Sequence, residues 1–273
     1  MIIIKTKKEI ELIREGGKLL GRILEELAAQ VKPGISAADL EKTAVRLISE
    51  AGGRPSFKGY VAGPGMDPFP TALCTSINDE VVHGPAVASR ILREGDIIGI
   101  DVGMEYPIVK KEGFPQNKYS KSGGYYTDMA KTVAVGKISK EAQKLINTTK
   151  ECLDLAIKQV IPGNSLKDIA RAVQKHAEAQ GFSVVRDLVG HGVGVKVHEE
   201  PKIPNYVINS REYDLKLEPG MVIAVEPMIN IGSYKIRTGD DDTTFETADG
   251  SLSAHFEHTI AVTDDGCEVL TKV

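Results

Sequence analysis

Cysteine is scarce in this chain of 273 residues. The three cysteines, Cys74, Cys152 and Cys267, are an odd number, lie far apart and form no CxxC pair. Disulfide frameworks need an even set of cysteines and zinc knuckles need closely spaced pairs, so neither is indicated. We expect all three thiols to be buried apolar groups, as free cysteines usually are.

Long apolar runs and a strong net charge are also missing. The N-terminal run from Met1 ends at Lys5 and is far shorter than a signal-peptide core or a membrane span. The formal net charge of -4 gives no general attraction to nucleic acid or to anionic lipid. The sequence therefore predicts a cytoplasmic protein without a membrane or nucleic-acid partner. Its 41% hydrophobic content suffices for a core.

A pair of helices is predicted twice. Apolar side chains recur at the spacing of one helix face from about residue 7 to 30, and a Pro-Gly pair then ends the run. A second helix is expected from about 36 to 52, because a capping-box-like serine and aspartate open it and two glycines close it. The segment 31–40 aligns with the segment 160–169 at a constant offset and shares its valine, Pro-Gly pair, serine and aspartate, so the same pair of helices is predicted in the second half.

The predicted strands repeat as well, and they end in carboxylates. Two similar apolar segments end in Asp101 and Glu226, and a further pair of similar segments carries Asp128 and Glu257. A single such carboxylate would be an exposed strand end, since Asp and Glu are mostly solvated. Four at matching positions would meet if two αβ halves packed around a pseudo-twofold axis, and they would stay ionised together only if cations held them. The repeat therefore indicates a metal site.

A glycine-rich segment, 190–201, presents two histidines, His191 and His198. Glycine permits the backbone to approach a site closely, although a lone histidine here would usually be structural. With the four carboxylates, His191 forms an oxygen-rich donor set with one nitrogen. Such a set suits Mn, Fe(II), Co or Zn better than a thiolate site would.

Seven ordered motifs resemble those of the type I methionine aminopeptidases of bacteria. They are Val81–Gly84, Gly99–Gly103, Tyr126–Ala130, Gly190–Gly192, His198–Pro201, Val225–Met228 and Phe256–Thr259. The resemblance covers nearly the whole chain. It implies an α+β pita-bread fold, in which two αβ halves surround a curved antiparallel sheet with the metals in a central cleft. We expect one catalytic domain over 1–273, with halves at about 1–136 and 137–273.

The resemblance also implies a role for each metal ligand. Asp101 would chelate one of two divalent ions, and Asp128 and Glu257 would bridge both. His191 and Glu226 would complete the second site. Two such ions acidify a shared water and polarise a scissile carbonyl. The resemblance leaves the choice among Co, Mn, Fe(II) and Zn open.

Three residues are expected to act in catalysis. Glu226 would carry a proton toward the leaving amine, and His198 would hydrogen-bond the developing oxyanion. His83 resembles the family histidine that contacts the substrate near the scissile bond. Taken alone, either of these histidines, His83 or His198, would more often have a structural role. Its position within the ordered set of motifs is what favours a catalytic role.

The resemblance places the methionine side-chain pocket in the stretch that holds Phe57, Tyr60, Phe69 and Cys74, whose soft or aromatic groups suit a thioether. Tyr60 and Cys74 align best with the family. Extra residues around 61–68 leave Phe57 and Phe69 equally compatible with ordinary core packing.

An insertion departs from the family pattern between Asp101 and Asp128, where a short hairpin is usual. Its surplus, about 105–126, contains prolines, glycines and lysines and predicts an exposed loop at the far end of an antiparallel hairpin. Either a passive insertion or a loop at the cleft rim is compatible with this composition. His255 stands where the family often has glutamine, and it would be a hydrogen-bonding group behind the metal ligands.

The predicted function is removal of the initiator methionine from nascent proteins, with a preference for a small second residue. Its partners would be polypeptide N-termini that begin with Met; a monomer is expected, and a transient ribosome contact stays open. One alternative is a peptidase like prolidase or aminopeptidase P, which usually carries an additional N-terminal domain. Another is a non-catalytic pita-bread binding protein, which we would expect to have lost metal ligands.

Overall fold

The computed structural model describes residues 2–63 and 65–273. Met1 of the N-terminal run and Pro64 of the 61–68 stretch lie outside the described residues. Within that part of the chain, no helix combines the length and apolar character needed to cross a membrane.

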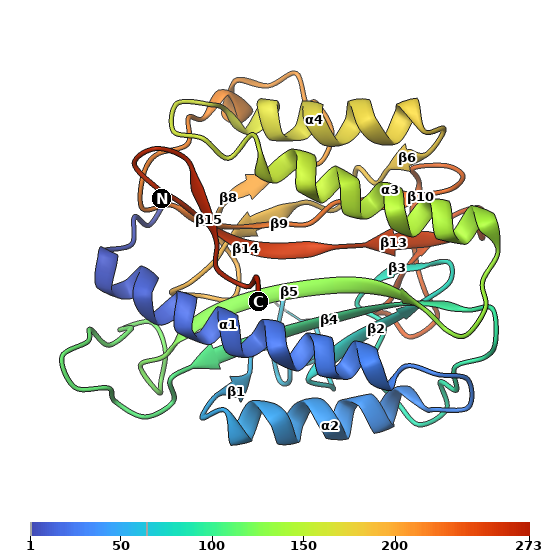
Figure 1. Cartoon of the computed structure of the whole chain (residues 1–273), viewed down its shortest axis with the longest axis horizontal. Coiled ribbons are helices and arrows are strands. Elements are labelled where there is room, and N and C mark those ends of the chain that lie inside the picture. The colour runs from blue at the N-terminus through green and yellow to red at the C-terminus, as the bar shows by residue number, and fades with distance from the viewer. Residues whose placement is uncertain (1, 64) are drawn as a thin grey trace.

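Four α-helices form two pairs, α1 with α2 and α3 with α4 (Figure 1). They are α1 (Lys7–Gln30), α2 (Ala37–Glu50), α3 (Lys140–Ile157) and α4 (Leu166–Ala179). The predicted bounds of the first two helices are confirmed. Local chemistry explains the starts, because the Asp39 carboxylate accepts the Ser36 backbone N–H at 3.2 Å and Asp168 accepts that of Ser165 at 2.8 Å.

The two helix pairs predicted as a repeat make equivalent backbone hydrogen bonds in the structure. Gly34 donates its N–H to the Leu92 carbonyl at 2.8 Å, and Gly163 donates to the Leu217 carbonyl at 2.9 Å. These bonds tie the turn between the helices of each pair to the segment that leads into a strand. The division of the chain near residue 136 stays a prediction.

The strands form one large sheet and two small ones. The bounds are β1 (Arg54–Pro55), β2 (Leu73–Ile77), β3 (Glu80–Val82), β4 (Ile97–Tyr106), β5 (Tyr125–Ala134), β6 (Ser183–Val184), β7 (Gly190–Gly192), β8 (Glu199–Ile203), β9 (Val222–Val225), β10 (Met228–Asn230), β11 (Ile236–Thr238), β12 (Phe245–Thr247), β13 (Ser253–His255), β14 (Glu257–Val262) and β15 (Cys267–Val269), with a 3-10 helix at Arg211–Asp214. The large sheet runs β1-β4-β5-β14-β9-β7-β8, with β2 beside β4 and β15 beside β14. Its pairings are antiparallel, as expected for the α+β class.

Side-chain alternation separates the core from the site. Ile98, Ile100 and Val102 of β4 pack in one cluster with Leu24 and Leu40 of the first helix pair. Successive side chains of a strand point to opposite faces, so the odd-numbered residues of β4 face away from these helices. On β9, Ile223 and Val225 likewise pack with residues of the second helix pair. The helices therefore cover the face that carries the even-numbered residues of β4, and Asp101 lies on the other face.

The insertion differs from the expected exposed loop at both ends. β4 continues to Tyr106 and β5 begins at Tyr125, and these two residues pair with each other, as Glu105 does with Tyr126. The prediction of a loop is wrong at these two ends because polar residues there are bonded to distant parts of the chain and remain in the strands. Tyr125, for example, donates a hydrogen bond to Glu9 at 3.1 Å. The loop leaves the far end of an antiparallel hairpin, as predicted (Figure 1).

Two of the three cysteines are buried as expected. Cys74 and Cys152 are enclosed, whereas Cys267 is only half-buried. The expectation is wrong for Cys267 because every residue of β15 keeps partial solvent access.

Candidate metal centre

Strand register brings three of the predicted carboxylates together. Asp101 of β4 and Glu257 of β14 both pair with Ala130 of β5, one from each side. Directly paired residues share a face of the sheet, and Asp128 lies two residues from Ala130 on that same face. The small alanine therefore sits between carboxylates that reach over it, on the face opposite the helices.

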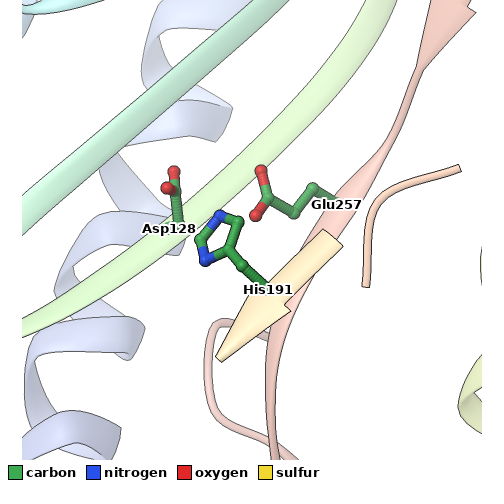
Figure 2. A group of neighbouring side chains, drawn as sticks. All are labelled: Asp128, His191 and Glu257. Carbon is green, nitrogen blue, oxygen red and sulfur yellow. The ribbon is translucent and has the colours of Figure 1, made fainter. Parts of the chain in front are cut away.

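Two more donors come from the adjoining strands. His191 of β7 pairs with Ala224 of β9, and Glu226 follows directly after β9. The His191 Nε2 atom lies 3.4 Å from Glu226 Oε1. Ligand atoms of Asp128, His191 and Glu257 lie within 4.8 Å of one another. Figure 2 shows these three side chains pointing toward one another from separate strands.

The donor atoms fit a cation. Asp101 Oδ1 and Glu257 Oε1 are buried and have no hydrogen-bond partner. An unpartnered buried anion is costly unless a positive charge meets it. The His191 ring places Nδ1 2.9 Å from the Gly192 carbonyl, and donation through Nδ1–H leaves the Nε2 lone pair free. All five predicted ligands line one cavity of about 740 Å³, so the structure brings the whole set together.

Burial dominates the protonation of this cluster. It raises the pKa of Asp128 to about 7. Burial and repulsion between the carboxylates raise the pKa of Asp101, Glu226 and Glu257 well above the usual range. The same desolvation lowers the pKa of His191 to about 4, so its ring is neutral near pH 7.

The two predicted catalytic histidines lie in the same cavity. The His198 ring meets the His191 ring edge to face at 4.4 Å, and its Nδ1 lies 2.7 Å from the Tyr60 hydroxyl. His83 adopts a left-handed backbone conformation, with φ 64°, and its ring lies 5.5 Å from that of Phe245. Desolvation lowers the pKa of His83 to about 4 and that of His198 to about 3. Both rings are therefore uncharged at neutral pH.

The four candidates for the methionine pocket also converge. Phe57 and Cys74 are buried together with Val197, and Tyr60 and Phe69 pack against this cluster. All four candidates line the cavity that holds the carboxylates. The extra residues between Tyr60 and Phe69 do not displace Phe69, because its N–H donates to the Tyr60 carbonyl at 2.8 Å.

Sequence reasoning missed several lining residues. Met66, Asp242, Thr243 and Phe245 also face the cavity. The acidic run before Thr243 has the composition of a turn, and no motif marks Phe245. His255, which the sequence indicated as a supporting group, is buried with its Nε2 3.7 Å from Glu226 Oε2.

Comparison with known proteins agrees with this geometry. The chain matches metallopeptidase family M24 over residues 11–113 and 116–264. The chain belongs to metallopeptidase family M24. The resemblance seen in the sequence motifs is thereby confirmed, and divalent-metal use by an M24 enzyme agrees with the donor set of the cavity.

Similar proteins within M24 are named methionine aminopeptidase. The chain is 44% identical over 271 residues to a methionine aminopeptidase of Clostridium acetobutylicum, covering 99% of each chain. It is also similar to the crystal structure of methionine aminopeptidase from Thermotoga maritima, with a TM-score of 0.87, 38% identity and complete coverage of both chains. The pita-bread fold class is confirmed.

A prolidase shares the fold only. The structure of prolidase from Pyrococcus furiosus matches 99% of this chain with a TM-score of 0.74, but identity is 21% and only 66% of that chain is covered. The proline-directed alternative therefore rests on fold similarity, whereas the methionine aminopeptidases match along the full length.

The metal-free M24 protein is expected to lose stability as the pH rises from 6.5 to 8. The raised carboxylate pKa values mean that the folded state holds protons that unfolded carboxylates, with pKa about 4, have released. Their stabilisation is present at low pH and is lost as the pH rises through the folded pKa values. Histidines with lowered pKa values act in the opposite direction at the lower end of this window, because unfolded imidazoles with pKa about 6.5 still bind protons there, and their effect fades by about pH 7.5.

Thermal unfolding after chelation measures this effect. We expect the Tm to fall by about 3 °C or more, since 1 kcal/mol corresponds to roughly 2–4 °C in a chain of this size. Protein saturated with Mn²⁺ should show little of this fall, because a cation holds the ionised carboxylates. A metal-free Tm that rose with pH in this window would contradict the prediction.

Proposed function

We propose that this enzyme removes the N-terminal methionine from polypeptides whose second residue is small. One observation carries the proposal: the five donors of the metal centre and the soft, aromatic cluster around Phe57 and Cys74 line a single cavity. A thioether side chain could then be held beside the groups that act on its peptide bond. The full-length similarity to methionine aminopeptidases supports the same substrate.

We propose that the donor set holds two divalent ions. Asp101 would chelate one ion, Asp128 and Glu257 would bridge both, and His191 with Glu226 would complete the second. Bound ions would supply Lewis acidity and an activated water at neutral pH. The neutral state of His191 and the free oxygens of Asp101 and Glu257 support this assignment.

Side chains that line the cavity would carry out the proton transfer and stabilise the developing oxyanion. Glu226 lines the cavity as a carboxylate and would carry a proton from the attacking water to the leaving amine. Burial raises the pKa of Tyr60, so its hydroxyl keeps its proton and can donate to His198 Nδ1. His198 then carries its own proton on Nε2 and can donate it to a developing oxyanion. His83 would contact the substrate near the scissile bond.

We further propose that the natural substrates are nascent chains beginning with methionine. His83, Phe245 and Met66 line the cavity that holds the candidate metal donors, and nearby walls of this kind would favour a small second residue. A monomeric state and a cytoplasmic location stay predictions from the sequence, and the choice among Co, Mn, Fe(II) and Zn and a ribosome contact stay open.

Peptide cleavage tests the proposed function. With Mn²⁺, Co²⁺, Fe²⁺ or Zn²⁺ supplied separately, Met-Ala-Ser should be cleaved at least about 10-fold more efficiently than Met-Leu-Ser, because a methylene-scale mismatch in a closed pocket costs about 10- to 200-fold. Ala-Pro peptides should not be cleaved. Metal content of protein purified without added metal would report the ion count. Faster cleavage of Ala-Pro than of Met-Ala-Ser would reject the proposal in favour of a prolidase-like activity.

A further inference from the structure

A second cavity, of about 640 Å³, adjoins the candidate active-site cavity. It lies where the segment 54–60, the β4–β5 hairpin with its insertion and the segment 195–198 meet. Tyr60, Lys196 and His198 line both cavities. The hydrogen bond between the Tyr60 hydroxyl and His198 Nδ1 therefore lies at the boundary between them. The volume is within the range of ordinary ligand-binding pockets.

The insertion contributes a wall of this second cavity. Its Tyr119 lines the cavity and is 52% exposed, and the ammonium groups of Lys118 and Lys196 each lie 5.3 Å from the centre of its ring. The side chain of Asn117 is buried and donates to the carbonyls of Gly124 and Val195, both at 2.8 Å. The insertion is thus bonded directly to the segment that carries Lys196.

The segment with Lys196 and His198 has a second support. The Glu199 carboxylate accepts the backbone N–H of Val195 at 2.6 Å and that of Lys196 at 3.0 Å. Glu199 is held in turn by Lys5 at 2.7 Å, and the two side chains are only 2% and 1% exposed. Buried, fully bonded supports of this kind keep a binding surface in one arrangement before a ligand arrives.

The second cavity presents positive charge. Arg54, Lys58 and Lys196 line it and are exposed. Glu105 is the carboxylate among its described lining residues, but its side chain is 0% exposed. That carboxylate accepts hydrogen bonds from Arg54, Ser120 and Ser122, so its charge is compensated within the wall. An anionic ligand would therefore meet an excess of cationic groups.

The position of this cavity identifies its occupant. An aminopeptidase holds the substrate N-terminus at the reacting centre, so the rest of the polypeptide must leave along an open side. Under the proposed function the scissile bond lies beside His198, and the second cavity begins on the other side of that residue. An extended chain advances about 3.3–3.6 Å per residue, so the third and following residues reach it.

We propose that the second cavity binds the polypeptide downstream of the cleaved methionine and favours acidic side chains at about its fourth to sixth positions. The inference rests on the proposed function. It assigns the insertion to substrate recognition at the cleft rim. Lys58 and Lys196 supply the charge, since Arg54 is paired with Glu105, and Tyr119 supplies an apolar surface for the backbone.

Matched peptides test the proposal on the metal-loaded enzyme. The substrates are Met-Ala-Ser, Met-Ala-Ser-Asp-Glu-Asp and Met-Ala-Ser-Lys-Arg-Lys. We expect kcat/KM to be about 5- to 10-fold higher for the acidic hexapeptide at low salt, since exposed charge pairs are individually weak. The preference should shrink in about 0.5 M salt because screening shortens the reach of surface charges.

Variants locate the preference in this cavity. Lys58→Glu should reduce the acidic-over-basic ratio about threefold or more, and Tyr119→Ala should raise KM for both hexapeptides. Lys175→Glu, an exposed charge reversal on α4, is the matched control and should leave the ratio unchanged.

The outcomes separate the two proposals. Equal kcat/KM for the hexapeptides in the wild type, or a preference that Lys58→Glu leaves intact, would overturn the cavity assignment alone, provided that Met-Ala-Ser is cleaved. No cleavage of Met-Ala-Ser would reject the proposed function and the cavity assignment that rests on it.

Discussion

Asp128→Asn is expected to remove metal binding and to lower kcat/KM by about 10³-fold or more. Asp128 belongs to the group whose ligand atoms lie within 4.8 Å of one another, and it would bridge both ions. Loss of supporting residues around metal ligands already costs about 10- to 100-fold, so loss of a bridging ligand should cost more. The change keeps the size of the side chain, so packing on β5 should persist.

The stability of the metal-free variant gives an independent measurement. Repulsion from Asp128 contributes to the raised pKa of Asp101, Glu226 and Glu257. Removing its charge should therefore leave metal-free Asp128→Asn at least as stable as the metal-free wild type at pH 8. Asp154→Asn on α3, an exposed carboxylate paired with Lys150, is the control and should change neither metal content nor activity. Full metal content and activity in Asp128→Asn would disprove the ligand assignment.

His198→Ala is expected to lower kcat by about 10²-fold while metal content stays near that of the wild type. The neutral ring of His198 can donate from Nε2 because its Nδ1 is occupied by the Tyr60 hydroxyl. Removal of one oxyanion donor typically costs about 10²- to 10³-fold in kcat. Metal analysis and kcat with Met-Ala-Ser measure the two quantities separately.

Tyr60→Phe provides the positioning control for that prediction. It removes the hydroxyl at His198 Nδ1 but keeps the aromatic ring that packs beside Phe57 and Cys74. We expect a smaller fall in kcat, about 10-fold, since His198 remains but can adopt either neutral tautomer. Loss of both metals from His198→Ala would show instead that this histidine is a ligand.

Local chemistry explains why the helices were predictable. The caps of α2 and α4 use a serine and an aspartate three residues apart, and such bonds form within one turn. The apolar face of α1 is likewise a short-range pattern, which is why its bounds of Lys7–Gln30 match the expectation. Neither signal depends on the rest of the fold.

The ends of the insertion were not predictable in the same way. Glu105 and Tyr125 are polar residues beside prolines and glycines, which is a loop-like composition. In the fold they are strand residues because Glu105 binds Arg54, Ser120 and Ser122, and Tyr125 binds Glu9. Those partners come from segments that the local pattern cannot place nearby.

The sequence by itself determined the helix pairs and the repeat and indicated the candidate metal donors, because periodicity, caps, repeats and residue types can be read along the chain without the fold. Only the tertiary structure decided that Asp101, Asp128 and Glu257 reach over Ala130 on the face away from the helices. It alone also placed the insertion against the segment before His198 and so enclosed a second cavity. Strand register and long-range hydrogen bonds fix these positions. Each joins residues that are far apart in the chain, and a local sequence pattern does not show which distant residues will meet.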